Sequence, residues 1–221
     1  EAAVFQRVLE KGRFTMGDSM KEFETDFAKK FKVSNALMVS SGSMANLIAL
    51  AAFFYKKKRP LQRGDEVIVP SISWATTYYP LQQFGLKLKF LDVELDTLNI
   101  DASKLEEALT SKTRMVVAVN ILGNPCALDT LRAFCDKYEL YLFEDNCESM
   151  GATLDSKACG TFGDIGTFST FFSHHISTME GGVIATEDEE IYYLAKSLRA
   201  DGWTRDIPLD SSIYKKKNDD I

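Results

Sequence analysis

Residues 36–93 read ALMVSSGSMANLIALAAFFYKKKRPLQRGDEVIVPSISWATTYYPLQQFGLKLKFLDV, and most of the architecture can be inferred from them. Short apolar runs alternate here with longer segments of helical periodicity. The apolar runs are 36–39, 66–69 and 88–93, and the helical segments are 43–55 and 75–84. Strands that are apolar on both faces and joined by helices form a largely parallel sheet covered on both sides. We therefore expect an α/β fold with three layers, α/β/α, and a mostly parallel sheet.

The same alternation extends in both directions along the chain. Ser19 begins a capping-box pattern, and Phe23, Phe27 and Phe31 place one aromatic stripe on the helix that follows. A second capping box at Ser103 predicts another helix start. The later predicted elements are strands at 114–119, 140–143, 168–172 and 182–186, with helices at 128–138 and 188–199 and turn residues at 160–167. No repeat or linker interrupts this pattern, so we expect residues 1–221 to form one domain.

Charge and composition argue against several classes of protein. The 221 residues carry a formal net charge of -6 and are 45% hydrophobic, which fits one globular core and disfavours a nucleic-acid binder. The basic runs 56–59 and 215–217 are interpreted as solvated helix ends. The four cysteines lack metal-site spacing, so we expect free thiols and no metal. With no signal-peptide layout and no apolar run of ~20 residues, we expect a cytoplasmic protein without a membrane partner.

Three loops follow apolar strands, where open α/β sheets bind their ligands. Gly42 and Ser43 stand at a helix start, where free N–H groups and the helix dipole suit a phosphate, although plain helix caps have the same composition. Trp74 has a flat face that suits stacking on a ring or ordinary packing. Asp145 ends a strand, either as a cap or as the partner of a protonated pyridine nitrogen.

The segment 160–182, GTFGDIGTFSTFFSHHISTMEGG, resembles the fold-type-I sugar aminotransferases and dehydratases that use pyridoxal phosphate (PLP). SWATTYYPLQQFGL, NILGNP, EDNCESMGA and LRADGWTR extend the resemblance over almost the whole chain, and it is greatest to the GDP-4-keto-6-deoxymannose 3-dehydratase branch. The family's aminotransferases have a lysine five residues after the serine that Ser169 matches. Here that residue is His174, and the histidine marks the dehydratases. A CDP-sugar branch also has it but adds cysteines for an iron–sulfur centre, and residues 183–221 contain none.

The resemblance implies a set of contacts to the cofactor. Gly42, Ser43 and Ser169 would contact its phosphate, and Trp74 would stack on its ring. Asp145 would hold the pyridine nitrogen protonated, which makes the ring an electron sink. The implied cofactor forms are pyridoxal 5'-phosphate and pyridoxamine 5'-phosphate (PMP).

The resemblance also implies roles in proton transfer and substrate binding. His174 would be the catalytic base, and the adjacent His175 would support the loop. Glu148, which stands where aminotransferases commonly carry Gln, would lie close to the ring hydroxyl. Asp201 stands where close relatives have His, so no acid–base role is assigned to it. Arg205 would bind a substrate phosphate or carboxylate, or would be a solvated arginine.

The implied activity is that of a lyase in deoxysugar and lipopolysaccharide O-antigen biosynthesis. PLP would take an amino group from glutamate, PMP would condense with the 4-keto group of a nucleotide-linked 6-deoxyhexose, and loss of the C3 hydroxyl would give a 3-deoxy-4-keto sugar. A GDP-linked sugar and a homodimer are expected, with a small C-terminal domain outside this sequence, whose ends look cut. The alternatives are an aminotransferase, which needs a lysine in place of His174, and a catalytically silent regulatory relative.

Overall fold

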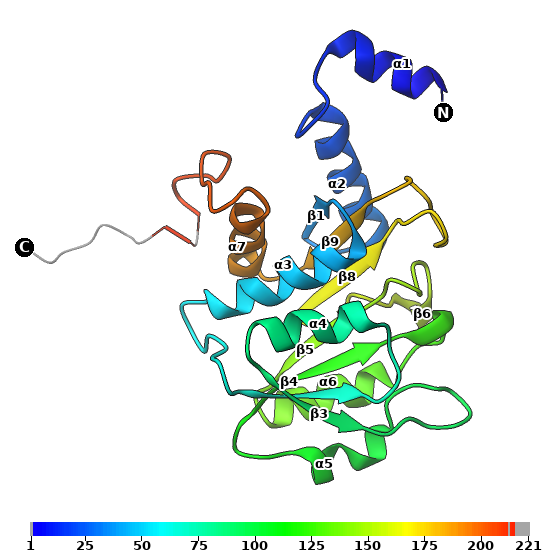
Figure 1. Ribbon diagram of the computed structural model, residues 1–221, viewed down its shortest axis with the longest axis vertical. Coiled ribbons are helices and arrows are strands. Elements are labelled where there is room, and N and C mark those ends of the chain that lie inside the picture. The colour runs from blue at the N-terminus through cyan, green and yellow to red at the C-terminus, as the bar shows by residue number, and fades with distance from the viewer. Residues whose placement is uncertain (1, 212, 215–221) are drawn as a thin grey trace, which may run out of the picture.

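A seven-stranded sheet forms the centre of the computed structural model, which describes residues 2–211 and 213–214 (Figure 1). The strand order is β1-β9-β8-β5-β4-β2-β3. Neighbouring strands are parallel, except that β9 runs antiparallel to both β1 and β8. The strands are β1 Asn35–Val39, β2 Glu66–Pro70, β3 Lys87–Leu91, β4 Thr113–Val119, β5 Tyr141–Asp145, β8 Ile165–Ser169 and β9 Gly182–Thr186, with β6 Thr153–Leu154 and β7 Lys157–Ala158 in a separate hairpin. The predicted mostly parallel sheet is confirmed.

Helices cover both faces of the sheet and produce the predicted three layers (Figure 1). One face packs against α3, α4 and α7, which bury Phe53, Leu81 and Ile191 in a common core. The other face packs against α5 and α6, which bury Leu105 and Leu131. The helices are α1 Ala2–Lys11, α2 Asp18–Phe31, α3 Gly42–Phe54, α4 Ala75–Gln83, α5 Leu105–Ala108, α6 Leu128–Lys137 and α7 Glu189–Arg199, with 3₁₀ turns η1 Ala102–Lys104 and η2 Ile121–Gly123.

The aromatic stripe of α2 belongs to the core, as the sequence predicts. Phe27 stacks on Phe31 with ring centroids 4.3 Å apart, and it meets Phe168 of β8 edge-on at 5.2 Å. Val183 of β9 joins the same cluster, so the stripe holds α2 against the β8–β9 part of the sheet. In contrast, α1 buries none of its residues and extends away from the sheet (Figure 1).

The carboxyl ends of six strands lie at one edge of the sheet. β1 and β8 each pair antiparallel with β9, so they run in the same direction as β2, β3, β4 and β5. The loops after these strands therefore gather at this edge, which is where ligands bind in open α/β sheets. β9 begins at the same edge, so the loop from β8 to β9, residues 170–181, also lies there.

Neither predicted capping box caps its helix. α2 follows Gly17, which has an extended conformation and no side-chain cap bond, so Ser19 lies within the first turn. The helix expected from Ser103 begins instead with the 3₁₀ turn η1, whose N-cap is Asp101. The Asp101 carboxylate accepts the Ser103 N–H at 3.0 Å, so an aspartate two residues earlier performs the capping that the serine pattern indicated.

The strand predicted at 168–172 lies three residues earlier, as β8. Gly166 of β8 approaches the backbone of Gly160 so closely that an added Cβ would lie 2.1 Å from the Gly160 carbonyl oxygen. Only glycine permits this approach, and residues interpreted as a turn therefore continue the sheet. Phe171 and Phe172 lie in the following loop, and Phe172 is exposed.

The interpretation of residues 56–59 as a solvated helix end is wrong for Lys56. The Lys56 side chain is 9% exposed, and its Nζ lies 2.5 Å from Asp188 Oδ2 and 3.4 Å from Glu190 Oε2. Burial lowers the pKa of the Lys56 ammonium, but the carboxylates of Asp188 and Glu190 outweigh it and raise that pKa above its usual value. The ion pairs of Lys56 therefore link the end of α3 to the start of α7. The second basic run, 215–217, lies outside the described residues.

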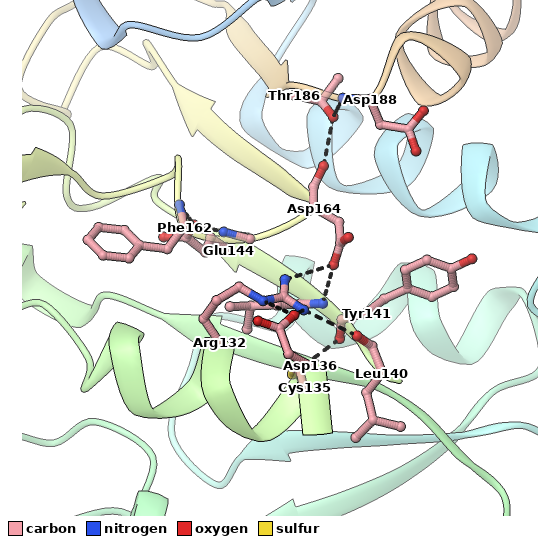
Figure 2. Close-up of polar contacts among 12 residues, drawn as sticks. Arg132, Cys135, Asp136, Leu140, Tyr141, Glu144, Phe162, Asp164, Thr186 and Asp188 are labelled. Carbon is pink, nitrogen blue, oxygen red and sulfur yellow. Dashed lines mark hydrogen bonds and ion pairs between the residues drawn. The ribbon is translucent and has the colours of Figure 1, made fainter. Parts of the chain in front are cut away.

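An aspartate joins several elements at the edge of the sheet opposite the carboxyl ends (Figure 2). Asp164 Oδ2 accepts the Leu142 backbone N–H at 2.7 Å and Arg132 Nη1 at 3.1 Å. The Asp164 carbonyl accepts the Thr186 hydroxyl at 2.7 Å. These bonds hold α6 and the starts of β5 and β8 to the end of β9. Within the described ranges, no helix has the length and apolarity needed to cross a membrane.

Candidate active site

A cavity of about 650 Å³ lies at the carboxyl edge of the sheet, and its volume suits a cofactor-sized ligand. Side chains from the loops after β1, β2, β4, β5 and β8 surround it. The lining residues are Ser41, Gly42, Ser43, Ser73, Trp74, Thr76, Thr77, Val119, Ile121, Asp145, Cys147, Glu148, Ser169, Phe171, Ser173, His174 and Glu180. Every residue predicted to contact the cofactor is among them.

The first turn of α3 provides one corner of the cavity. Ser41 is the N-cap and its hydroxyl accepts the Met44 N–H at 3.1 Å, so α3 begins at Gly42, one residue before the predicted start. An added Cβ on Gly42 would lie 2.6 Å from Ser169 Cβ and 2.8 Å from Cys147 Sγ. Glycine therefore lets this helix end approach the end of β8. The first N–H groups of a helix have no partner within it, which makes this corner suitable for a phosphate.

Asp145 lies at the end of β5 and is 5% exposed, yet it lines the cavity. Its Oδ2 accepts from Asn46 Nδ2 at 2.9 Å and from the Thr77 hydroxyl at 2.8 Å, and its Oδ1 accepts the Cys147 N–H at 3.1 Å. Asn46 and Thr77 are not among the residues predicted from the sequence. A signal existed for Asn46, which is the one amide within the apolar helix segment 43–55.

The Cys147 thiol also lies at this end of the cavity. Burial raises its pKa well above the ordinary range for a thiol, and the neighbouring Asp145 carboxylate raises it further. The thiol is therefore protonated at neutral pH and lacks the thiolate that a cysteine nucleophile requires.

Trp74 and Glu148 form part of the wall of the cavity. Trp74 is the N-cap residue of α4, and its side chain is 73% exposed, so one face of the indole is free for stacking. Glu148 Oε2 accepts the Leu122 N–H at 3.0 Å. Leu122 belongs to η2 and has a φ of 51°, which is a left-handed backbone conformation. Glu148 therefore stabilises a turn that contains a left-handed residue. The predicted proximity of Glu148 to a ring hydroxyl stays a prediction.

The loop from β8 to β9 places His174 at the cavity. The two ends of the loop are joined by Thr170 and Thr178, whose hydroxyl oxygens lie 2.7 Å apart. His174 lines the cavity, whereas His175 does not and is exposed. The Nδ1 atom of His174 is buried and has no hydrogen-bond partner among the described residues. The His174 ring itself lines the cavity, and this position fits the predicted role as a base.

The cavity combines the features that a phosphate-bearing pyridine cofactor requires. The helix start at Gly42 lies close to the buried hydroxyl of Ser169. The indole of Trp74 is exposed, and the carboxylate of Asp145 is buried. These groups suit the phosphate, the ring face and the ring nitrogen of PLP respectively. No lysine lines the cavity in the part of the chain that the structure describes. The described residues also contain no cluster of His, Cys, Asp and Glu that could hold a metal ion.

Arg205 does not line this cavity. Its side chain is 63% exposed, its Nε lies 3.4 Å from Asp206 Oδ2, and its guanidinium stacks over Trp203 at 5.0 Å. The predicted substrate contact of Arg205 stays a prediction. The neighbouring Asp201 lies in the turn after α7 and is likewise not among the residues that line the cavity.

Comparison with known proteins agrees with this geometry. A family model described as the DegT/DnrJ/EryC1/StrS aminotransferase family matches residues 1–215. The chain is similar over its full length to a GDP-4-keto-6-deoxy-D-mannose 3-dehydratase of Escherichia coli O55:H7, with 53% identity over 220 residues that cover 57% of that protein. The chain therefore spans a little over half the length of this relative.

Two solved structures are similar to this chain, each with a TM-score of 0.92 and 53% identity, covering 97% of this chain and 56% of theirs. One is a GDP-4-keto-6-deoxymannose-3-dehydratase with a trapped PLP-glutamate geminal diamine. The other is a variant of that enzyme in which a histidine is replaced by asparagine, with bound GDP-perosamine.

Proposed function

The chain belongs to the DegT/DnrJ/EryC1/StrS aminotransferase family, and on this basis we propose that it is the cofactor-binding domain of a PLP- and PMP-dependent sugar 3-dehydratase. The substrate is a GDP-linked 4-keto-6-deoxyhexose, the amino donor is glutamate, and the product is a 3-deoxy-4-keto sugar. The observation that carries the proposal is His174, which lines the cavity together with Asp145, in a site without a lysine among the described lining residues.

The chain's own groups bind and orient the cofactor. Gly42 and Ser43 at the start of α3, and the Ser169 hydroxyl close to Gly42, would hold its phosphate. Trp74, which lines the cavity, would stack on the ring, and Asp145 would accept the N–H of the protonated ring nitrogen. When bound, the cofactor supplies an amine that condenses with a ketone and a ring that accepts the electrons released at the carbon beside that amine.

His174 transfers the proton. An imidazole exchanges protons near neutral pH, and a base that has accepted a proton can return it as an acid. Because its ring lines the cavity, the His174 imidazole could accept a proton released at the bound cofactor and could return it to the departing C3 hydroxyl. A histidine, unlike the lysine of the aminotransferases, forms no stable covalent link to the cofactor, so PMP stays free to react.

The relatives support the substrate and the role of the histidine. The E. coli relative acts, by its name, on GDP-4-keto-6-deoxy-D-mannose, and related structures contain PLP with glutamate and a GDP-sugar. In one of them a histidine was replaced. This chain has two histidines, His174 and His175, and of these His174 lines the cavity. An aminotransferase would need a lysine there. A silent relative would have no reason to keep Gly42, Trp74 and Asp145 around one cavity.

We also propose a homodimer located in the cytoplasm, where nucleotide sugars are made. Support for the dimer comes from α1, which exposes Val4, Phe5 and Leu9 to solvent in the single chain. Sedimentation analysis should give a dimer. Replacing Phe5 and Leu9 together by aspartate should shift the protein to the monomer, and a monomeric wild-type protein would contradict the proposal.

The function is tested by a spectrum and an assay. Adding PLP to the protein should produce a visible absorbance band, and adding glutamate should remove it as PMP forms. GDP-4-keto-6-deoxymannose should then be converted to a 3-deoxy-4-keto product, detected by mass spectrometry as the loss of one oxygen atom from the sugar. An aminated sugar would identify an aminotransferase, and no spectral change on adding PLP would contradict the cofactor assignment.

A further inference from the structure

Two buried side chains from different helices donate to the same oxygen of Asp145. Asn46 of α3 is 2% exposed and Thr77 of α4 is 5% exposed. Their Nδ2 and Oγ1 atoms lie 2.9 Å and 2.8 Å from Asp145 Oδ2. The third donor, the Cys147 N–H, binds Oδ1 at 3.1 Å. A carboxylate offers about four acceptor sites, so one site remains for a donor in the cavity.

The orientation of the Asn46 amide is fixed from its far side. The Thr167 hydroxyl of β8, fully buried, donates to Asn46 Oδ1 at 2.6 Å. Asn46 Nδ2 uses its second hydrogen on the Thr76 carbonyl at 3.3 Å. A reversed amide would place its oxygen against two acceptors, the Asp145 carboxylate and the Thr76 carbonyl, and would lose both bonds. Asn46 can therefore present only N–H to Asp145.

The Thr77 hydroxyl is oriented in the same way. It has one hydrogen, which it donates to Asp145, so the Ser73 hydroxyl at 2.7 Å must be the donor in the Ser73–Thr77 bond. Ser73 and Thr77 both line the cavity. Two chains of hydrogen bonds therefore end at Asp145 Oδ2. One begins in β8 and passes through Asn46, and the other begins in the loop after β2 and passes through Thr77.

We propose that Asn46 and Thr77 are positioning residues that fix the plane of the Asp145 carboxylate, so that its remaining acceptor site meets the N–H of the cofactor's pyridine ring. This inference rests on the proposed function, because it requires a pyridine nitrogen as the ligand of Asp145. Hydrogen bonds weaken steeply away from linear geometry, so a carboxylate free to turn would hold the ring proton less firmly. Loss of either donor should therefore make the bound ring nitrogen easier to deprotonate.

The test follows the ring nitrogen directly, with PLP labelled with ¹⁵N at that position and bound to the protein. Its chemical shift is measured against pH. Thr77→Val and Asn46→Leu remove one donor each with little change in shape, and each should lower the midpoint of the nitrogen's titration by about one pH unit or more. Thr77→Ser, which keeps the hydroxyl, should restore the wild-type midpoint.

A control variant distinguishes a role in positioning Asp145 from an effect on the stability of the fold alone. Thr186→Val removes an equally buried threonine hydroxyl, bonded to the Asp164 carbonyl at the other edge of the sheet (Figure 2). It should lower the melting temperature without moving the titration midpoint. If Thr77→Val or Asn46→Leu does not fold, Ser73→Ala removes the donor to Thr77 at a less buried position and should move the midpoint in the same direction.

The outcomes distinguish this inference from the proposed function. Variants that bind PLP with an unchanged midpoint would overturn the positioning role and leave the cofactor assignment intact. An unchanged midpoint in Ser73→Ala, where the other variants do not fold, would overturn it equally. A wild-type protein that binds no PLP would contradict the proposed function itself.

Discussion

His174 and His175 are neighbours in sequence, but only His174 lines the cavity. We expect His174→Asn to reduce the rate of dehydration by roughly 10²–10⁴-fold, the usual contribution of a general acid–base group. PMP affinity should change little, since the imidazole acts on a proton and not on the phosphate or the ring. His175→Asn is the matched control and should keep its activity. The measurements are product formation under saturating substrate and a PMP titration, and undiminished turnover in His174→Asn would remove the residue from the mechanism.

Gly42 is the residue on which the approach of α3 to β8 depends. A methyl group at this position would lie 2.6 Å from Ser169 Cβ and 2.8 Å from Cys147 Sγ, so the helix start must move. Overpacking of this kind costs about 1–3 kcal/mol, and we expect Gly42→Ala to weaken PLP binding by roughly 10–100-fold. Absorbance titration with PLP measures the loss. Wild-type affinity in Gly42→Ala would show that this corner does not hold the phosphate.

The sequence predicts the residues that carry recognisable chemistry and misses those that only support them. His174, Asp145 and Trp74 stand in motifs, and the structure brings them to one cavity. Asn46 and Thr77 stand in helices, where a polar side chain usually faces solvent or caps a turn. Their role depends on two helices meeting at β5, and this meeting cannot be inferred from the local pattern.

At the scale of elements, Asp164 joins α6 to β5 and β8 (Figure 2). We expect Asp164→Ala to destabilise the protein by about 2–3 kcal/mol, because it leaves the Leu142 N–H without its charged partner and breaks the bond to Arg132. Asp136→Ala removes another carboxylate that pairs with Arg132. This carboxylate is 66% exposed, so its loss should lower the free energy of unfolding by about 0.5 kcal/mol or less. Urea unfolding of both variants measures the difference, and equal losses would contradict this reading of the network.

The boundaries of the elements show which local signals decide an element's position. β9 lies where the sequence predicts it, because its apolar run is complete, and α7 begins within one residue of the predicted start, because Asp188 caps it there. β8 is displaced because its start depends on the contact of Gly166 with Gly160. The buried Lys56 was misread because its carboxylate partners come from residues far along the chain.

For the whole molecule, buried thiols make stability depend on pH in the alkaline range. Burial raises the pKa values of Cys126 and Cys135 to about 12, from an ordinary value of 9.0. Above pH 9 the unfolded thiols lose protons that the folded ones keep, so the folded protein binds more protons and its stability falls as pH rises. Each thiol contributes about 1.4 kcal/mol per pH unit to this decline.

Cys135→Ala isolates the contribution of one thiol. The variant should be less stable than the wild type at pH 7.5, because it leaves a small cavity, but its unfolding free energy should fall less steeply between pH 9 and 10.5. Urea unfolding at several pH values gives both slopes. Comparison with the wild type cancels the titration of lysines and tyrosines in the same range, and equal slopes would show that the Cys135 thiol ionises in the folded state.

The pairing of β1 with β9 has a consequence for how the protein is made. β1 emerges from the ribosome before the other strands of the sheet, but its sheet partner β9 is synthesised after all of them, and Gly182 must pack against the Ser41 carbonyl. Contacts between such distant segments form slowly, because a long loop has to be closed first. The parallel strands β2 to β5 can assemble while translation continues, whereas the corner between Gly42 and Ser169 cannot. Uptake of PLP by nascent chains should therefore begin only after β9 has left the ribosome, and cofactor binding would report the completion of folding.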